Sequence, residues 1–280
     1  MSKLQNKIDF VALVSVKMAN GNGDPLNGNR PRTDYESFGE ISDVCVKRKI
    51  RNRMQDMGHK IFVQSADRCE DGYKSLSERA SKEIGKVTDA DEYARIACEK
   101  WLDVRAFGQV FAFKADKSGV SVGVRGPVSI HQAVSVSPVE VRSMQITKSV
   151  NGEPGEKRSS DTMGSKHFVR FGLYKVKGAI NVQLAEKTGF SEEDAQTVKE
   201  CLRTLFENDA SAARPEGSME VVKLYWWEHN CPSGQHSSAK VHELVQAKLK
   251  QDVAAPTSVD NYEITLGELP GLHCEIIDGL

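Results

Sequence analysis

The chain has almost no net charge, no closely spaced pair of cysteines and no long apolar run. Its 280 residues carry a formal net charge of −1, whereas nucleic-acid-binding domains usually have a basic excess. Any basic surface must therefore be local. No stretch approaches the roughly 18 apolar residues of a membrane-spanning helix. The apolar run after Lys7 is broken by Asp9 and is followed by no small-residue cleavage site, so we interpret it as a strand and expect no membrane association.

The cysteines give no sign of a disulfide framework. None stands in a Cys-x-x-Cys pair or at short regular spacing; the six are Cys45, Cys69, Cys98, Cys201, Cys231 and Cys274. This usage favours a reducing, cytoplasmic location. Gly21-Asn-Gly23 is too short for a dinucleotide-binding or Walker loop. We therefore expect no nucleotide cofactor and no bound metal.

Apolar residues alternate along a segment near the N-terminus. From Ile8 to Met18 every second residue is apolar, and Val11 and Leu13 make the other face partly apolar as well. This pattern predicts an inner strand. The following loop from Asn20 to Arg32 is rich in Gly, Asn and Pro, which favour turns and leave backbone N–H groups unpaired.

A helix is predicted next. Ser42 is a typical N-cap and Asp43 would lie in the first turn. Apolar residues then recur at helical spacing and predict a buried face; they are Val46, Ile50, Met54 and Met57. The element therefore packs one side against the core.

The same helix carries a local excess of positive charge. Five basic residues lie between Lys47 and Arg53, and few acids stand at compensating i,i+4 positions. Lys47 and Arg51 are one turn apart with Arg48 beside them, a spacing that suits neighbouring phosphates of one strand. Such contacts bind any base sequence. A solvated charged face is the ordinary alternative.

Two further segments predict insertions. Residues 67–101 are polar and helix-like, with scattered apolar anchors typical of an inserted subdomain. Between 150 and 165 the chain is too polar to pack, and the strand-like segments 144–147 and 167–171 flank it. This arrangement predicts a protruding β-hairpin.

The remaining elements complete a fold pattern. We predict a strand from Phe171 to Leu184, a helix beginning at Ser191 and an aromatic-rich strand from Met219 to Trp227. With the earlier elements, and strand segments between Val120 and Val139, the order is strand, helix, strands, strand, helix, strand. This is the order of an α+β, ferredoxin-like sheet with insertions.

A possible metal site offers an alternative function. Its four residues are zinc-ligand types in a short window: His229, Cys231, His236 and His242. Their spacing matches no compact zinc finger, and the segment Pro232-Ser-Gly234 is typical of an ordinary turn. A metal-dependent enzyme built on this cluster stays open as an alternative.

Several short motifs, taken in order, resemble one known family. They are Asn20-Gly-Asn-Gly-Asp-Pro, Pro31-Arg-Thr-Asp34, Ile41-Ser-Asp-Val, Lys47-Arg-Lys-Ile-Arg51, Arg105-Ala-Phe-Gly108, Gly126-Pro-Val128, Thr188-Gly-Phe-Ser191 and the segment from Phe206 to Arg214. Each is weak alone. Their order, up to about His229, is similar to that of the backbone subunit of CRISPR-associated Cascade complexes, with the type I-C version most similar.

The resemblance implies an RRM-like palm with a helical finger insertion and a β-hairpin thumb. On this chain the palm would take residues 1–60, 105–133 and, with the C-terminal segment, 171–280; the finger would be 61–104 and the thumb 134–170. It also implies a non-catalytic scaffold that polymerises along CRISPR RNA and presents the guide for pairing with target DNA. Other Cascade subunits, further copies of itself and a recruited helicase-nuclease would be its partners.

The resemblance also assigns contacts to individual residues. Guide phosphates would be held by Lys47, Arg48 and Arg51, supported from the loop by Asn20, Asn22, Arg30 and Arg32. Met144 or Met163 would be the wedge that the thumb inserts between bases. Further RNA contacts are expected at Arg125, Lys148, Lys166, His167 and Arg214. No RNP motif is present, so base stacking on the sheet face is not expected.

Two hypotheses accompany this assignment. The acid-rich stretch from Glu186 to Asp194 is predicted to meet basic residues of a neighbouring copy, which would account for the neutral net charge.

The alternative function is an endoribonuclease that processes the CRISPR transcript, with His59 or His131 as its base.

Overall fold

The computed structural model describes residues 2–113, 121–147, 149 and 163–280. Its main feature is an eight-stranded sheet in which every strand pairing is antiparallel. Six strands follow one another across it: β14 (Cys274–Asp278), β11 (Met219–Glu228), β1 (Ile8–Ala19), β10 (Met163–Ile180), β8 (Ala133–Pro138) and β4 (Phe38–Ile41). β7 (Val128–Ile130) and β9 (Val141–Thr147) also pair with β10. The predicted mixed fold is confirmed at this level.

Strand β1 lies inside the sheet, as its sequence predicts. It pairs with β10 on one side and β11 on the other. Its even-numbered apolar residues from Ile8 to Val16 belong to one hydrophobic cluster, while Val11 and Leu13 belong to a second on the opposite face. Met18 was predicted to continue the buried face and does not: its φ is 53° and 46% of its surface is exposed.

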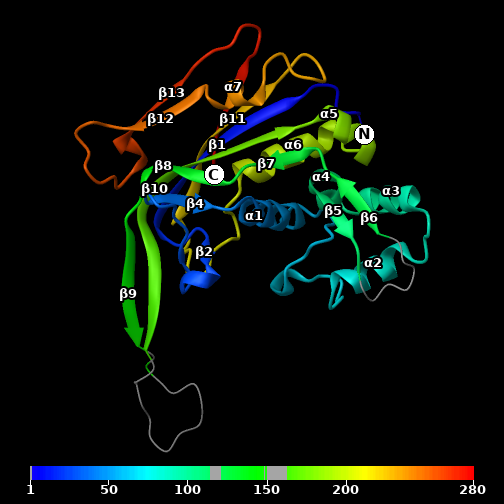
Figure 1. Ribbon diagram of the computed structural model, residues 1–280, viewed down its shortest axis with the longest axis horizontal. Helices are drawn as coiled ribbons and strands as arrows, with labels where there is room; N and C mark the ends of the chain where they lie inside the picture. Colours follow the sequence, from blue (N-terminus) through cyan, green and yellow to red (C-terminus); the bar gives the residue numbers. More distant parts are fainter. Residues whose placement is uncertain (1, 114–120, 148, 150–162) are drawn as a thin grey trace, which may run out of the picture.

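Helices cover one face of the sheet. α1 (Asp43–Asp56), α5 (Val182–Thr188) and α6 (Glu192–Arg203) contribute to the larger cluster, and α1 and α6 lie on one side in Figure 1. In α1 the Ser42 side chain caps the helix by accepting from the Cys45 N–H at 3.3 Å. Met57, predicted to be buried, ends the helix and is 37% exposed.

The strand predicted to reach Leu184 ends earlier. β10 stops at Ile180, and the Asn181 side chain accepts from the Leu184 N–H at 2.8 Å to cap α5. The prediction was wrong because an apolar run does not distinguish a strand from the first turn of a helix. The helix predicted from Ser191 is present and begins with a capping box between Ser191 and Asp194.

The polar segment predicted to be an insertion forms helices with a small core of their own. α2 (Leu76–Ile84), α3 (Ala90–Lys100) and α4 (Leu102–Phe107) follow the short helix η2 (Ala66–Arg68). Aromatic rings fill this core. The centroid of the Phe62 ring lies 4.7 Å from that of Trp101 and 5.0 Å from that of Phe111. The hairpin β5 (Gly108–Phe111) and β6 (Val122–Arg125) packs into the same cluster, so this core continues past residue 104.

A second layer covers the opposite face of the sheet. It contains α7 (Ser238–His242), η3 (Val259–Asn261) and the hairpin of β12 (Val245–Leu249) with β13 (Tyr262–Leu266). Val241, Val245 and Tyr262 pack there against the strands. In Figure 1 this layer lies on the far side of the sheet from α1 and α6.

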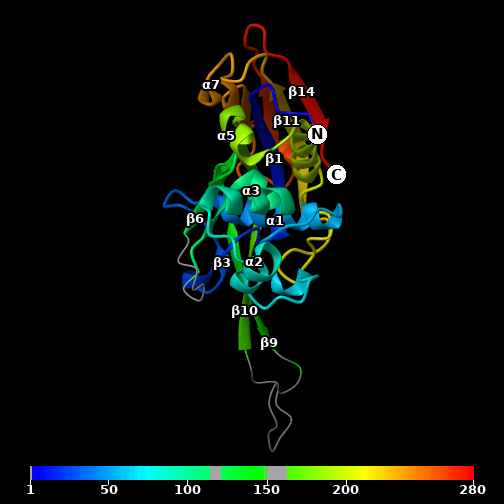
Figure 2. The ribbon, with the colours of Figure 1, turned by 90° about the vertical axis from the view of Figure 1, so that its right-hand side faces the viewer.

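The predicted protruding hairpin is present. β9 pairs with the first part of β10 from Met163 opposite Thr147 to Val169 opposite Val141. Figures 1 and 2 both show it extending away from the body. Of the predicted tip between 150 and 165, Met163 to Ser165 belong to β10, and residues 150–162 lie outside the described residues. Among the helices that are described, none has the length and apolar character needed to cross a membrane.

Candidate nucleic-acid interface

The five basic residues of α1 divide between two sides of the helix. Lys49 and Arg53 are 4% and 7% exposed, on the side that faces the chain after α6. Lys49 forms an ion pair with Asp209, and burial lowers the pKa of its ammonium group. Arg53 pairs with Glu207 at 2.6 Å. These two residues fasten the helix, so only part of the predicted excess of positive charge on this helix reaches the surface.

The other three basic residues share one stripe. Lys47, Arg48 and Arg51 follow the exposed Val44 at spacings of three, four and seven residues, which places all four on one side of α1. Each is held by contacts within the chain: Lys47 Nζ lies 3.0 Å from Asp43, Arg48 Nη2 donates to the Val63 carbonyl at 2.6 Å and Nη1 to Asn52 at 3.4 Å, and Arg51 Nε donates to Asp103 at 2.9 Å. We call Lys47, Arg48 and Arg51 the α1 stripe.

Asp103 is a positioning residue that the sequence analysis missed. It is fully buried and accepts from the backbone N–H groups of Phe62 at 2.6 Å and Val63 at 3.1 Å as well as from Arg51. The Arg51 guanidinium also lies 5.1 Å above the Phe107 ring. The available signal was a lone acid between apolar Leu102 and Val104, directly before one of the family motifs.

The loop before α1 is held by its own amides. It contains β2 (Gly23–Asp24), η1 (Pro25–Asn27) and β3 (Arg30–Pro31). Asn20 donates to the Asn29 carbonyl at 2.7 Å, and Asn22 accepts from the Ser42 N–H at 2.9 Å. Both predicted RNA contacts therefore have a structural task, which is to shape the loop and fix the start of α1.

Arg30 joins this loop to the protruding hairpin. Its Nη1 donates to Ser143 Oγ at 2.7 Å, and Ser143 Oγ lies 2.9 Å from His167 Nδ1. Arg32 lies 3.5 Å from Asp24. The loop and the base of the hairpin thus form one continuous surface.

Strand register separates the two wedge candidates. Met163 stands opposite Thr147 and His167 opposite Ser143, so these four side chains lie on the hairpin face that Arg30 contacts. Lys166 stands opposite Met144, one position out of phase, on the other face. Both methionines are exposed, Met144 at 51% and Met163 at 65%. Lys148 lies outside the described residues.

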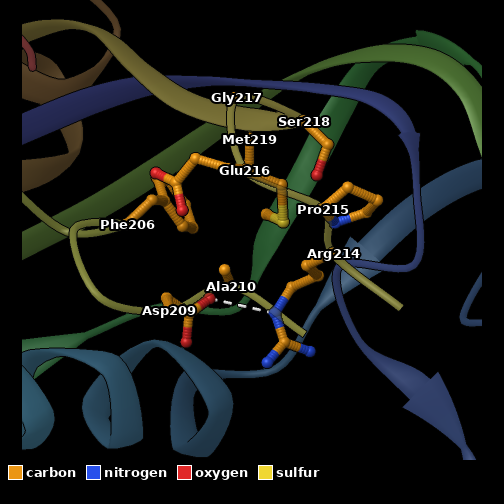
Figure 3. Close-up of a pocket in the computed structure, with 9 residues that line it drawn as sticks. All are labelled: Phe206, Asp209, Ala210, Arg214, Pro215, Glu216, Gly217, Ser218 and Met219. Atoms are coloured by element: carbon orange, nitrogen blue, oxygen red, sulfur yellow. Dashed lines mark hydrogen bonds and ion pairs between the residues drawn. The ribbon is translucent and has the colours of Figure 1, made fainter. Parts of the chain in front are cut away.

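Arg214 approaches α1 from the chain between α6 and β11. Figure 3 shows its guanidinium facing Asp209, with Nε 2.9 Å from the carboxylate that also binds Lys49. Burial raises the pKa of the nearby Cys45 thiol, while the charges of Lys49, Arg214 and Arg32 lower it. These three cations therefore gather around the first turns of α1.

Arg125 lies elsewhere. It stands on β6, in the insertion, and lines a cavity with residues of α3 and α5 that include Arg95 and Lys187. No hydrogen bond or ion pair among the described residues connects it with the α1 stripe. The structure therefore does not bring Arg125 together with the other predicted contacts.

The candidate metal cluster is a hydrogen-bonded support instead. His229 Nε2 lies 2.8 Å from Asp9 Oδ2, His242 Nε2 lies 2.9 Å from the Gly178 carbonyl, and His236 bonds to the Pro270 carbonyl. The described residues contain no group of three or more side chains suited to a metal. The metal-enzyme alternative is corrected, because these imidazoles are already engaged.

Two other hypotheses concern acids near the start of α6 and two histidines. Glu192 and Glu193 accept from the backbone N–H groups of Gln5 and Ser2, and Asp194 pairs with Arg105 at 2.7 Å. These three acids already make contacts within the chain, whereas Glu186 of the same stretch is exposed. Contact of this stretch with a neighbouring copy stays a prediction. His59 and His131 make no side-chain hydrogen bond with the described part of the chain, and the His131 ring lies edge-on to His242 with the ring centroids 5.8 Å apart. A role for either imidazole as a base stays a prediction.

Comparisons with known proteins agree with the motif order. Residues 6–267 match the family model described as CRISPR-associated protein Cas7. A protein of Haloferax volcanii with the same description is 26% identical over 232 residues, which are 75% of this chain and 67% of that protein. A chain from a structure titled "CRISPR RNA-guided surveillance complex, pre-nicking" is 16% identical with a TM-score of 0.53, covering 89% of this chain and 84% of its own length, and so shares the fold. The chain belongs to the CRISPR-associated protein Cas7 family.

Proposed function

We propose that this chain is a non-catalytic scaffold that binds CRISPR RNA along its backbone and polymerises on it in a type I-C Cascade surveillance complex. Membership of the Cas7 family supports this proposal, and the chain with the similar fold comes from a CRISPR RNA-guided surveillance complex. The observation that carries it is the α1 stripe, whose three cations are partly exposed along one side of the helix, while Lys49 and Arg53 hold the helix in place.

The stripe suits a phosphate backbone for a physical reason. Each of its side chains has one or two donors tied to the protein, which fixes the direction of the remaining donors while the side chain keeps its own positive charge. A fixed cation loses little conformational entropy when a phosphate arrives. No base edge is read in this way, so guides of any sequence can bind.

The fold supports a palm, finger and thumb arrangement. Four central strands in the order β11, β1, β10, β7, with α1 and α6 on one face, match an RRM-like palm. In this proposal residues 61–104 are the finger and 134–170 the thumb. Target DNA, further copies of the chain, other Cascade subunits and a helicase-nuclease are the partners, in the cytoplasm.

The test is a charge reversal at Lys47. The Lys47→Glu variant places a carboxylate in the stripe, and we expect its affinity for a single-stranded CRISPR guide RNA to fall roughly 10- to 100-fold. Lys248→Glu is the matched control, because it makes the same change of charge at an exposed position of β12. Arg51→Glu is unsuitable, since it would set a carboxylate against the buried Asp103 and unfold the protein.

Co-purification from cells that carry a CRISPR array decides between functions. Intact guide RNA of discrete length, bound by the wild type and lost from Lys47→Glu, supports the scaffold. Random RNA or none would contradict it. Metal-independent cleavage of repeat RNA by the purified chain would favour the endoribonuclease instead.

A further inference from the structure

A cavity lies at the edge of the second layer, on the face of the sheet opposite α1. Its volume is about 340 Å³, and β8, β10 and β12 contribute to its walls. Val136 and Ala247 of the lining pack against the hydrophobic cluster of the second layer. We call it the second-layer cavity. At about 30 Å³ for each water it has room for roughly eleven, so a small organic molecule can enter and a folded domain cannot.

Basic side chains determine the charge of this cavity. Lys175 and Lys177 stand two residues apart on β10 and both line it, because alternate residues of a strand share one face. His131 lines it as well, and none of the described lining residues is acidic. The second-layer cavity therefore attracts a small anion.

The two lysines have different partners. Lys177 Nζ lies 2.9 Å from the Glu243 carboxylate, and this contact lowers the pKa of that carboxyl. Lys175 Nζ donates instead to the Val245 carbonyl at 2.6 Å and forms no ion pair with any described residue. An ion pair favours the ammonium form of a lysine, whereas a carbonyl accepts from a neutral amine as well as from an ammonium. Only Lys175 can therefore lose its proton and keep its contact.

The surroundings of Lys175 favour the free amine. Burial lowers the pKa of its ammonium group, the charge of Lys177 lowers it further, and Glu243 opposes both. Beyond these two residues, His131 is the titratable group on this side, since β8 and β12 contribute none to the described lining. Desolvation and a neighbouring cation are the two conditions that make a lysine nucleophilic near neutral pH.

We propose that Lys175 is a site of covalent acylation by small acyl phosphates that enter the second-layer cavity. The amine nitrogen attacks the acyl carbon, a C–N bond forms, and the bond from that carbon to the phosphate oxygen breaks. The phosphate leaves with the electrons of that bond and takes up the proton that the nitrogen gives up. Lys177 and His131 favour an acyl phosphate over a neutral acyl donor, because they attract its phosphate. The site is independent of the proposed function, since it lies away from the α1 stripe.

Acetyl phosphate is the probe that tests this proposal. The full chain is incubated with it at neutral pH, and acetylation of each lysine is followed over time by digestion and mass spectrometry. Each unit by which a pKa falls gives about tenfold more free amine and takes back only part of that gain in nucleophilicity. We therefore expect Lys175 to react at least about 3-fold faster than Lys177, or than Lys248 at an exposed position of β12. Equal rates at the three lysines would overturn the inference.

Two changes of charge beside Lys175 should act in opposite directions. Lys177→Gln removes the neighbouring cation and leaves Glu243 unpaired, so the rate at Lys175 should fall about 2- to 5-fold, while Lys177→Arg should keep it. Glu243→Gln should raise the rate by a similar factor. Glu268→Gln makes the same change at an exposed position outside the cavity and should have no effect.

The response to these variants separates a built site from an accessible side chain. A rate at Lys175 that neither Lys177→Gln nor Glu243→Gln alters would show that exposure alone controls the reaction, and would overturn the inference. Inorganic phosphate in excess should slow acetylation at Lys175 and not at Lys248, because it competes for the cations of the second-layer cavity. Equal slowing at both lysines would contradict a role for the cavity in holding the acyl phosphate.

Discussion

Buried ionisable residues outside the α1 stripe serve the fold, and the clearest case surrounds Asp9. This carboxylate is fully buried on the central strand, and Lys7, His229 and His242 lie 2.9, 2.8 and 3.5 Å from it. His229 accepts from the Gln235 N–H at Nδ1, so its proton is on Nε2, towards Asp9. The network ties the C-terminal segment to β1.

Protonation of His242 should weaken this attachment. Burial lowers the pKa of His242 from its usual 6.5, against the favourable effects of the Gly178 carbonyl and Asp9, while His131 and Lys177 lower it further. The unfolded chain therefore takes up this proton at a higher pH than the folded one. The resulting contribution to stability is present above about pH 6.5 and is lost as the pH falls below it, at up to about 1.4 kcal/mol per pH unit.

Urea unfolding at pH 7.5 and 5.5 measures the effect. His242→Gln can still donate to the Gly178 carbonyl but takes up no proton, so we expect it to lose less stability on acidification than the wild type. His273→Gln makes the same change at an exposed position and serves as control. Equal losses in the wild type and His242→Gln would show that this imidazole does not couple pH to folding.

The sequence predicts which cations share one side of α1, but not which cations form ion pairs with acids of the same chain. Helical spacing alone puts Lys47, Arg48 and Arg51 together. The acids that bind Lys49 and Arg51 are Asp209 and Asp103, which are distant in the chain. Spacing along one helix contains no information on such partners, and so the expectation of few compensating acids was accurate for i,i+4 pairs and incomplete for the molecule.

At the scale of elements, local signals were reliable and long-range ones were not. The caps at Ser42 and Ser191 depend on neighbouring backbone groups, so both helix starts were predicted. The end of β10 at Ile180 and the exposed Met18 depend on what the chain packs against. The short strands β2, β3, β12 and β13 were not predicted, because each gains its stability from its partner strand.

The hairpin faces lead to a prediction about the wedge. Met163 lies on the face with His167 and the Arg30 contact, and Met144 lies on the opposite face. If the guide follows the surface from the α1 stripe to this face, only Met163 meets it. We therefore expect Met163→Ala, and not Met144→Ala, to abolish base unstacking in the bound guide.

Guide RNA with 2-aminopurine at single positions reports this directly, because the probe brightens when it leaves the stack. Wild-type complexes should show bright positions that Met163→Ala loses and Met163→Leu, which keeps the apolar volume, retains. Loss of the signal in Met144→Ala with Met163→Ala unaffected would assign the wedge to the other face.

At the scale of the whole molecule, the neutral net charge has a structural account. Many cations are paired within the chain, including Arg53 with Glu207, Arg105 with Asp194 and Arg79 with Asp71. The acids are therefore distributed to hold the fold, and the α1 stripe is a local exception. The two-layer covering of the sheet and the edge position of β14 arise from contacts across the whole chain, which no single segment of the sequence reveals.

A neutral protein with a local stripe should bind RNA with a modest dependence on salt. For single strands the slope of log affinity against log salt is about −0.7 per phosphate neutralised, so three stripe cations predict a slope near −2 for each bound subunit. Lys47→Gln should reduce the slope by about 0.7, while Lys248→Gln, at an exposed position of β12, should leave it unchanged. Titrations between 50 and 300 mM salt measure it. A slope that Lys47→Gln does not alter would mean that binding depends on cations outside α1, because removal of a true phosphate contact must release fewer counterions.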